Sequence, residues 1–286
     1  MAYTKAKIKK RELPGEVLCW GVIAALVFLI IFPFAYILST ALKSDQDLAT
    51  SVGRILPESV QWDNFAKAWE LLDFPTNFLN SFVVSASVTL LTVLLCSMAA
   101  YVFTRLEFKG RNILFVVYLS TMMIPITVRL IPSYMLCREL NLLDTYSGMI
   151  LPQVAWSIPF GTFLMRQFYF GIPKELDEAA KIDGATHLQI FTKVLMPLTK
   201  SSMTTLGTYT FIQAWNNLIW MLLVVQSESK WTVTLGISSI CGASVIKQPT
   251  WNLIMGVIVI GMIPVLILFF AFQKYFMQSV AATGIK

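Results

Sequence analysis

The chain has 286 residues, of which 56% are apolar and only 13% are charged, with a mean hydropathy of +0.68. Soluble domains carry roughly 25% charged residues, so the composition excludes a purely water-soluble fold and indicates a protein whose solvent is partly lipid. The net charge of +6 is spread over several short segments and forms no basic face, which argues against a nucleic-acid partner.

Six apolar runs are long enough to cross a bilayer as helices, and they predict an all-α integral membrane protein with six transmembrane helices. They cover residues 17–42, 81–104, 112–136, 146–165, 201–226 and 251–273. Residues 1–16 are expected to form an N-terminal segment in the cytoplasm. The first run is too long for the apolar core of a signal peptide, so we expect an uncleaved span. The third run holds Arg129 between Pro125 and Pro132, so that half is expected to be broken or to lie near an interface.

The distribution of Lys and Arg predicts the orientation. If the N-terminus is cytoplasmic, the inner segments hold 15 of these residues and the outer segments hold 7. Cytoplasmic loops carry the excess of positive charge in membrane proteins. Both termini, and the loop between the fourth and fifth spans, are therefore expected to be cytoplasmic. On the outer side, WDNFAKAWELL between the first two spans predicts a short amphipathic helix that caps the outer mouth.

Four cysteines and one histidine show no metal-ligand spacing, so no metal site is expected. Cys19 and Cys96 fall in predicted spans, where cysteine is expected to be a buried small apolar residue. Cys137 and Cys241 are both expected on the outer side, and the sequence does not decide whether they form a disulfide. His187 lies in the cytoplasmic loop and is expected to be solvated or at an interface.

The loop between the fourth and fifth spans, about residues 171–198, contains the sequence GIPKELDEAAKIDGAT. Pro173 suits the first turn of a helix, and acids in that turn complement the positive end of the helix dipole. These acids are Glu175, Asp177 and Glu178. Gly184 after Asp183 is a plausible left-handed stop. The loop therefore predicts a helix of about three turns lying roughly along the membrane.

Leu176, Ala179 and Ala180 are expected to share one face of this helix. One interpretation is an interfacial helix whose apolar face rests on lipid. Such helices usually present bulky apolar residues to lipid and basic residues to the headgroups, whereas this one presents alanines and acids. We therefore favour the other interpretation, in which the helix fits a groove on a cytoplasmic partner protein.

The stretch EAAKIDGATHLQIFTKVLMPL resembles the EAA motif of ATP-binding-cassette (ABC) importer permeases, at Glu178, Ala179, Ala180, Gly184 and Pro197. AWNNLIWMLLVV and the tail QKYFMQSVAATGIK resemble the MalG-like permeases of carbohydrate importers. The resemblance implies an ABC type-1 permease domain over residues 17–286. It implies the permease subunit of an ATP-driven, binding-protein-dependent importer in the bacterial cytoplasmic membrane, with a sugar or oligosaccharide as cargo.

The resemblance also implies that this loop forms a coupling helix that docks on an ATPase subunit. The residues implied in coupling are Glu175, Glu178, Ala179, Ala180, Asp183, Gly184 and Ala185. The implied partners are a second homologous permease, two ATP-binding-cassette subunits and an extracytoplasmic solute-binding protein. The chain contains no GxxxxGK[ST] loop, so it is expected to have no catalytic residues and no cofactor, with ATP and Mg²⁺ bound by the partner ATPase.

The fifth apolar run carries polar and aromatic side chains that suit a sugar path. They are Tyr209, Gln213, Asn216, Asn217 and Trp220. Amides in a span are costly unless they face protein or water, so they either line a path or join helices. Met122, Met123 and Trp156 are either gate residues or simple packing. The resemblance leaves open whether this chain or the second permease makes the main cargo contacts.

Other functions explain less of the sequence. An ion-coupled secondary transporter usually embeds acids or histidine in its spans, and the six predicted runs contain no acid. An intramembrane enzyme would need a catalytic set within the bilayer, and none is evident. A purely structural membrane protein does not explain the loop helix. A polyol or glycerol-phosphate cargo stays an alternative to a sugar.

Overall fold

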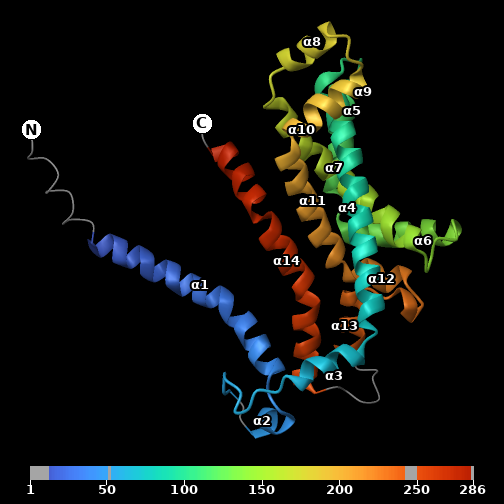
Figure 1. The fold of residues 1–286 in the computed structure, drawn as a ribbon. Coiled ribbons are helices and arrows are strands. Elements are labelled where there is room, and N and C mark those ends of the chain that lie inside the picture. The colour runs from blue at the N-terminus through green and yellow to red at the C-terminus, as the bar shows by residue number, and fades with distance from the viewer. Residues whose placement is uncertain (1–12, 51–52, 242–249, 285–286) are drawn as a thin grey trace, which may run out of the picture. The chain divides into compact units, whose positions relative to one another are not determined.

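The computed structural model describes residues 13–50, 53–241 and 250–284, and in these ranges the chain forms helices and loops without a β-strand (Figure 1). This confirms the all-α prediction. The chain divides into two compact units, one of residues 1–71 with 246–260 and the other of residues 72–245 with 261–286. Most of the predicted N-terminal segment, residues 1–12, lies outside the described ranges.

Four helices are long and apolar enough to cross a membrane, and a bent pair makes a fifth candidate. The four are α1 (Leu13–Ala41), α4 (Phe74–Arg105), α7 (Tyr146–Phe170) and α14 (Trp251–Gly284). The predicted continuous helix over residues 201–226 is wrong, because Asn216 and Asn217 separate α11 (Lys200–Trp215) from α12 (Leu218–Val224). The protein therefore has several apolar spans, and the fifth predicted run forms two shorter helices.

The first unit contains α1, α2 (Asp45–Thr50), α3 (Asp63–Leu71) and the first part of α14. α3 lies within the predicted amphipathic segment and confirms that helix. Asn64 and Asn252 each donate a side-chain hydrogen bond to the Lys43 carbonyl, at 2.8 and 2.9 Å, so two buried amides hold the turn after α1. Along α1 most apolar side chains are exposed, and so is Cys19, which corrects the expectation that Cys19 is buried. An apolar exposed surface of this kind suits lipid.

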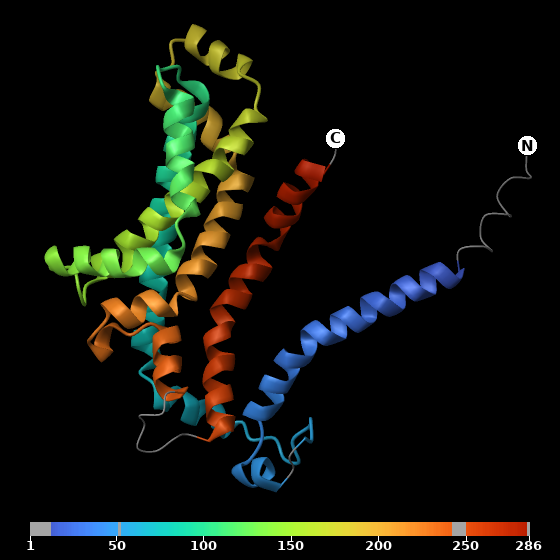
Figure 2. The same ribbon diagram turned by 180° about the vertical axis from the view of Figure 1, so that it is seen from behind.

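In the second unit α4, α7 and α11 lie side by side (Figures 1 and 2). A Cβ added at Gly161 on α7 would lie 2.5 Å from the Cys96 Sγ on α4, so the two helices approach closely because this position has no side chain. Cys96 and Cys137 are buried, Cys241 is exposed, and all are free thiols. The pairing of Cys137 with Cys241 that the sequence left open is therefore not made.

The third predicted span is sharply bent. It consists of α5 (Arg111–Ser120), η1 (Thr121–Met123) and α6 (Ile126–Glu139), and the two halves meet at 97°. Ile124 adopts an extended conformation with ψ of 117° because a residue before proline avoids the helical region. Of the two alternatives for this half of the span, a break or a position near an interface, the structure shows the break, and its position is Ile124–Pro125.

Short helices complete this unit. They are α8 (Glu175–Ile182), α9 (His187–Gln189), the π-helix η2 (Ile190–Leu195), α10 (Met196–Leu198), η3 (Glu228–Lys230) and α13 (Val233–Cys241). α8 and α9 lie at one end of the α4–α7–α11 layer, and α12 and α13 lie toward the other end (Figure 1). One core cluster includes Ala100, Tyr169 and Phe191, and a second includes Val84, Met149 and Trp220.

A carboxylate ties the loops at the α12 end. Asp144 accepts hydrogen bonds from the backbone N–H groups of Gln226 and Ser227, both at 3.0 Å, and from the Ser227 hydroxyl. It also pairs with Lys230 at 3.2 Å. The Ser227 hydroxyl, these two N–H groups and the Lys230 ammonium hold the pKa of Asp144 well below its usual range. The loop after α6 is thereby joined to the loop after α12.

Candidate functional site

α8 has defined ends. Glu175, Asp177 and Glu178 lie in its first turn, where carboxylates complement the helix dipole. At the other end Gly184 has φ of +81°, its N–H donates to the Lys181 carbonyl and the Ala185 N–H donates to the Ala180 carbonyl. This is a Schellman termination, and it confirms Gly184 as the left-handed stop. The helix has 8 residues and is shorter than predicted because it begins only after Lys174.

One face of α8 is anchored to the rest of the unit. Asp177 is buried and its Oδ2 lies 2.8 Å from the Nε of Arg105, the last residue of α4. Nη2 of Arg105 donates to the Ile172 carbonyl at 2.9 Å, just before the helix. Ala180 and Ala185 pack against the core cluster that includes Ala100. The loop helix is therefore fixed to α4 and does not hang free.

A second contact lies just beyond the helix. The Tyr101 hydroxyl on α4 and the Nδ1 of His187 on α9 are 2.9 Å apart, and their rings meet edge to face. Thr186 and Gln189 form a capping box at the start of α9. These contacts make α4 the element to which both α8 and α9 are attached.

The outer face of α8 is open. Leu176 is 43% exposed and Ile182 is 87% exposed, and Ala179 between them is also exposed. The predicted shared face of Leu176, Ala179 and Ala180 is corrected: Ala180 is turned inward and Ile182 takes its place. Of the other residues expected in coupling, Glu175, Glu178, Asp183 and Gly184 are exposed, and Ala185 is partly buried.

A groove of about 570 Å³ lies beside α8. It is lined by Arg105, Leu106, Glu107, Phe108, Lys174, Asp177, Glu178, Lys181 and His187. Sequence reasoning missed the roles of Arg105 and Asp177. All three acids of the first turn serve the dipole equally well in sequence, and the position of Arg105 at the end of another helix gives no local signal.

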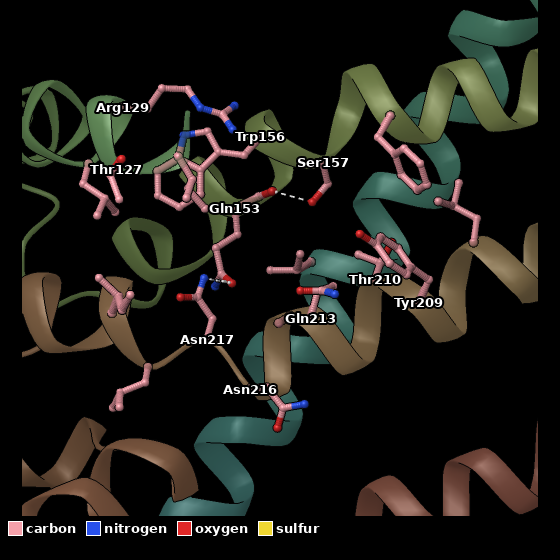
Figure 3. A pocket seen from close by; sticks show the side chains of 18 residues that line it. Thr127, Arg129, Gln153, Trp156, Ser157, Tyr209, Thr210, Gln213, Asn216 and Asn217 are labelled. Carbon is pink, nitrogen blue, oxygen red and sulfur yellow. Dashed lines mark hydrogen bonds between the residues drawn. The ribbon is translucent and has the colours of Figure 1, made fainter. Parts of the chain in front are cut away.

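A cavity of about 530 Å³ lies between α4, α6, α7, α11 and α12 (Figure 3). Its polar and aromatic lining residues are Thr127, Arg129, Gln153, Trp156, Ser157, Phe160, Tyr209, Thr210, Gln213, Asn216 and Asn217. The structure thus brings together four of the five residues expected in a substrate path, namely Tyr209, Gln213, Asn216 and Asn217. It adds groups from α6 and α7 that the sequence reasoning, confined to the fifth run, did not include in the path.

Two side-chain amides in this cavity, those of Asn217 and Gln153, are held in place by a hydrogen bond between them. The Asn217 Nδ2 donates to Gln153 Oε1 at 2.7 Å (Figure 3), and Gln153 Nε2 donates to the Met149 carbonyl at 2.7 Å. The Asn217 Oδ1 accepts from the Trp220 N–H at 3.3 Å, which caps the start of α12. Asn217 therefore both starts α12 and joins it to α7.

Three other polar groups are free to meet a ligand. Within the described ranges, the side-chain amides of Gln213 and Asn216 and the hydroxyl of Tyr209 form no hydrogen bond with the chain, and all three side chains are exposed. The Tyr209 ring packs on Phe160 with centroids 5.1 Å apart. These groups offer hydrogen bonds and an aromatic face, which are the contacts that a sugar ring uses.

Trp220 lies outside the cavity lining. It is fully buried, its Nε1 donates to the Gly148 carbonyl at 3.0 Å, and Trp156 packs edge to face against it at 5.0 Å. Sequence alone does not separate a buried tryptophan from one that lines a path. In this structure Trp220 supports Trp156, which lines the cavity.

Residues 92–282 match the family described as the binding-protein-dependent transport system inner membrane component. The match covers α8 and nearly the whole cavity lining, and the chain belongs to this family. It is therefore the membrane-embedded permease component of an ABC importer, and ATP hydrolysis is the task of a separate subunit.

Relatives match over nearly their whole length. The chain is 30% identical over 282 residues to the probable ABC transporter permease protein YurM of Bacillus subtilis (strain 168), covering 99% of this chain and 92% of YurM. It is 33% identical over 266 residues to the arabinooligosaccharides transport system permease protein AraQ of the same strain, covering 91% and 92%. It is 31% identical over 271 residues to the sn-glycerol-3-phosphate transport system permease protein UgpE of Yersinia pestis, covering 92% and 95%.

Solved structures share the fold. A chain of a bacterial ABC transporter that imports the acidic polysaccharide alginate matches with a TM-score of 0.79 and 22% identity, over 93% of this chain and 98% of that chain. A chain of the bacterial alginate transporter in complex with its alginate pentasaccharide-bound periplasmic protein matches with a TM-score of 0.67 and 14% identity, over 93% and 94%. At these identities the likeness concerns the fold alone.

Proposed function

We propose that this chain is one permease half of a bacterial importer for a sugar or oligosaccharide, and that α8 is its coupling helix. The observation that carries the proposal is the two-sided construction of α8. Its inner face is locked to α4 through Asp177 and Arg105, and its outer face presents Leu176, Ala179 and Ile182. A short rigid helix with one anchored and one open apolar face suits a groove on a partner protein.

The partners follow from the family and from the relatives. The proposed assembly contains a second permease, two ATP-binding-cassette subunits and an extracytoplasmic solute-binding protein. The alginate transporter, whose fold this chain shares, is described in complex with a ligand-bound periplasmic protein. ATP and Mg²⁺ are proposed to bind to the cassette subunits, with no cofactor on this chain.

The proposed topology has six membrane crossings over residues 17–286. The bent pair of α5 and α6 is the third crossing, and α11 with α12 is the fifth. The excess of Lys and Arg in the proposed inner segments supports a cytoplasmic position for both termini and for α8 at the bacterial inner membrane. α8 is thereby proposed to face the compartment that holds ATP.

The proposed mechanism transmits force from α8 to the cavity. Closure of the ATPase subunits displaces α8, and the Arg105–Asp177 pair passes the displacement to the end of α4. Val88 on α4 lines the cavity, as do residues of α7 and α11, which pack on α4. The cavity walls therefore move together when α4 moves, in the manner of a hinge or shear transition.

The proposed cargo class rests on the cavity and the relatives. Exposed amides, the Tyr209 hydroxyl and the aromatic wall suit a polyhydroxylated molecule, and AraQ is named for arabinooligosaccharides. UgpE is named for sn-glycerol-3-phosphate, so a phosphorylated polyol is the second candidate. An ion-coupled transporter gains no support, because the sequences of α4, α7, α11 and α12 contain no Asp, Glu or His.

The proposal is tested by reversing the exposed charge at Glu178. In the assembled importer, Glu178→Lys is expected to lower ATP-driven uptake at least tenfold and to weaken retention of the ATPase during purification. Glu139→Lys reverses an exposed charge at the end of α6 and serves as the matched control. Normal uptake by the Glu178→Lys importer would contradict the coupling role of α8.

A further inference from the structure

Arg129 on α6 is the one charged side chain among the described residues that line the cavity. It is half-buried, and its Nε is enclosed without a hydrogen-bond partner. Within the described ranges the three ion pairs of the chain do not include it. A cation inside an apolar segment is costly and is retained where it meets a counter-charge or a water-filled cavity. The structure therefore leaves the Arg129 guanidinium beside the cavity without a counter-charge from the described chain.

The surroundings of Arg129 are those of a ligand site. Its side chain extends toward the Trp156 ring, and Tyr209 and Gln213 face the same cavity from α11 (Figure 3). A side chain that only reached toward lipid headgroups would lie on an outer face instead of beside these groups. The lining contains no carboxylate, so nothing in the described chain competes for the guanidinium.

We infer that Arg129 binds the anionic group of the cargo, so that this importer carries a polyhydroxylated anion. The inference rests on the proposed function and narrows its cargo class. A guanidinium binds carboxylate and phosphate in a bidentate fork, the free amides of Gln213 and Asn216 suit hydroxyl groups, and Trp156 offers a ring face. A uronic-acid oligosaccharide and a phosphorylated polyol both fit this chemistry.

The test uses the complete importer in proteoliposomes with its permease partner, ATPase subunits and binding protein. Digalacturonate supplies a carboxylate and sn-glycerol 3-phosphate supplies a phosphate, and digalactose and glycerol are their neutral counterparts. We expect ATP-dependent uptake of at least one anionic probe, and the probe that is carried identifies the anion. Arg129→Gln is expected to lower that uptake at least tenfold, and Arg129→Lys is expected to retain more of it.

The matched control is Arg138→Gln, which removes the same charge from an exposed position on the same helix outside the cavity lining. It is expected to leave uptake within about twofold of the wild type, because surface substitutions of this kind are mild. ATP-dependent uptake of neutral probes alone would overturn the inference and leave the proposed function intact. Loss of the second permease from the Arg129→Gln complex would assign Arg129 to subunit contact and would also overturn it. Absence of ATP-dependent uptake of both anionic probes would overturn the inference, while the Glu178→Lys experiment tests the proposed function separately.

Discussion

Arg105 and Asp177 form a buried ion pair that joins the end of α4 to the first turn of α8. The Arg105 Nε lies 2.8 Å from the Asp177 Oδ2, and the exposed fractions of the two side chains are 5% and 9%. The same guanidinium holds the Ile172 carbonyl before the helix. A fully surface-exposed pair is worth little, whereas removal of one partner from a buried pair leaves an uncompensated charge. This pair therefore fixes the position of α8.

Removal of one partner is predicted to destabilise the protein. Asp177→Asn and Arg105→Gln are each expected to cost about 3–5 kcal/mol, while the double variant that combines these two substitutions is expected to cost less than their sum. Thermal unfolding of the purified importer measures this. Glu107→Gln, an exposed acid in the neighbouring loop, is the control and is expected to change stability little. Additive single effects would show that the two residues act independently.

Any side chain at position 184 is predicted to destabilise the protein, and the reason is the backbone conformation of Gly184 alone. A Cβ at this position meets no atom within 4 Å, so the expected cost of Gly184→Ala, about 1–2 kcal/mol, comes from φ of +81°. Gly184→Pro is expected to cost more, because proline fixes φ near −65°. Both are expected to raise the number of ATP molecules hydrolysed per cargo molecule.

The matched control for Gly184 is Gly171→Ala in the same loop. Gly171 has φ of −74°, and an added Cβ would lie 3.4 Å from its nearest neighbour, the Phe168 carbonyl oxygen. Stability and coupling ratio are expected to stay close to the wild type. Equal effects of the two alanine substitutions would contradict the role of the left-handed stop.

Substitution of Asn217 is predicted to lower the stability of the protein, whereas substitution of its neighbour Asn216 is predicted to lower transport. Asn217→Ala removes the cap of α12 and leaves Gln153 Oε1 without its donor, so a loss of about 2–4 kcal/mol is expected. Asn216 has an exposed amide without a partner in the described chain, so Asn216→Ala is expected to leave the melting temperature unchanged and to lower uptake. Uptake assays and thermal melts of both variants check this, and an unstable Asn216→Ala variant would contradict it.

Asp144 is predicted to give a pH-dependent contribution to stability. Its pKa is lowered in the folded protein, so its contribution is fully present above the ordinary carboxyl pKa of 3.8 and is lost as pH falls from there toward the lower folded value. Asp144→Asn is expected to lower the melting temperature equally between pH 8 and pH 5. Below pH 4 the difference in melting temperature between Asp144→Asn and the wild type is expected to shrink. A gap that shrinks above pH 5 would assign the effect to another group.

The sequence predicts those features that depend on local chemistry. The stop at Gly184, the helix before it and the bend near Arg129 follow from glycine, acidic and proline residues in short windows. The break at Asn216–Asn217 was missed because the apolar count on both sides favours one continuous span. Its signal was present in the paired asparagines, since a side chain that caps a helix start interrupts the helix before it.

Features that depend on packing between distant parts of the chain could not be predicted from local sequence patterns. The burial of Asp177 depends on Arg105 at the end of α4, and the burial of Trp220 depends on the Gly148 carbonyl on α7. The inward turn of Ala180 depends on the core cluster beneath it. Arg129 gave a signal as a charge in an apolar run, but its place in the cavity lining appears only when α6, α7 and α11 come together.

The most direct test of the account is a cross-link from Ala179 to the ATPase. In a background of Cys19→Ser and Cys241→Ser, which removes the exposed thiols, Ala179→Cys on the open face of α8 is labelled with benzophenone-4-maleimide. The assembled importer is then irradiated, so that the photoactivated ketone inserts into a C–H bond of whichever chain lies against it. Glu228→Cys, exposed at the α12 end, is the control. We predict a covalent adduct with the ATPase subunit from position 179 and none from position 228. An intact complex in which position 179 yields no ATPase adduct would contradict the coupling role of α8.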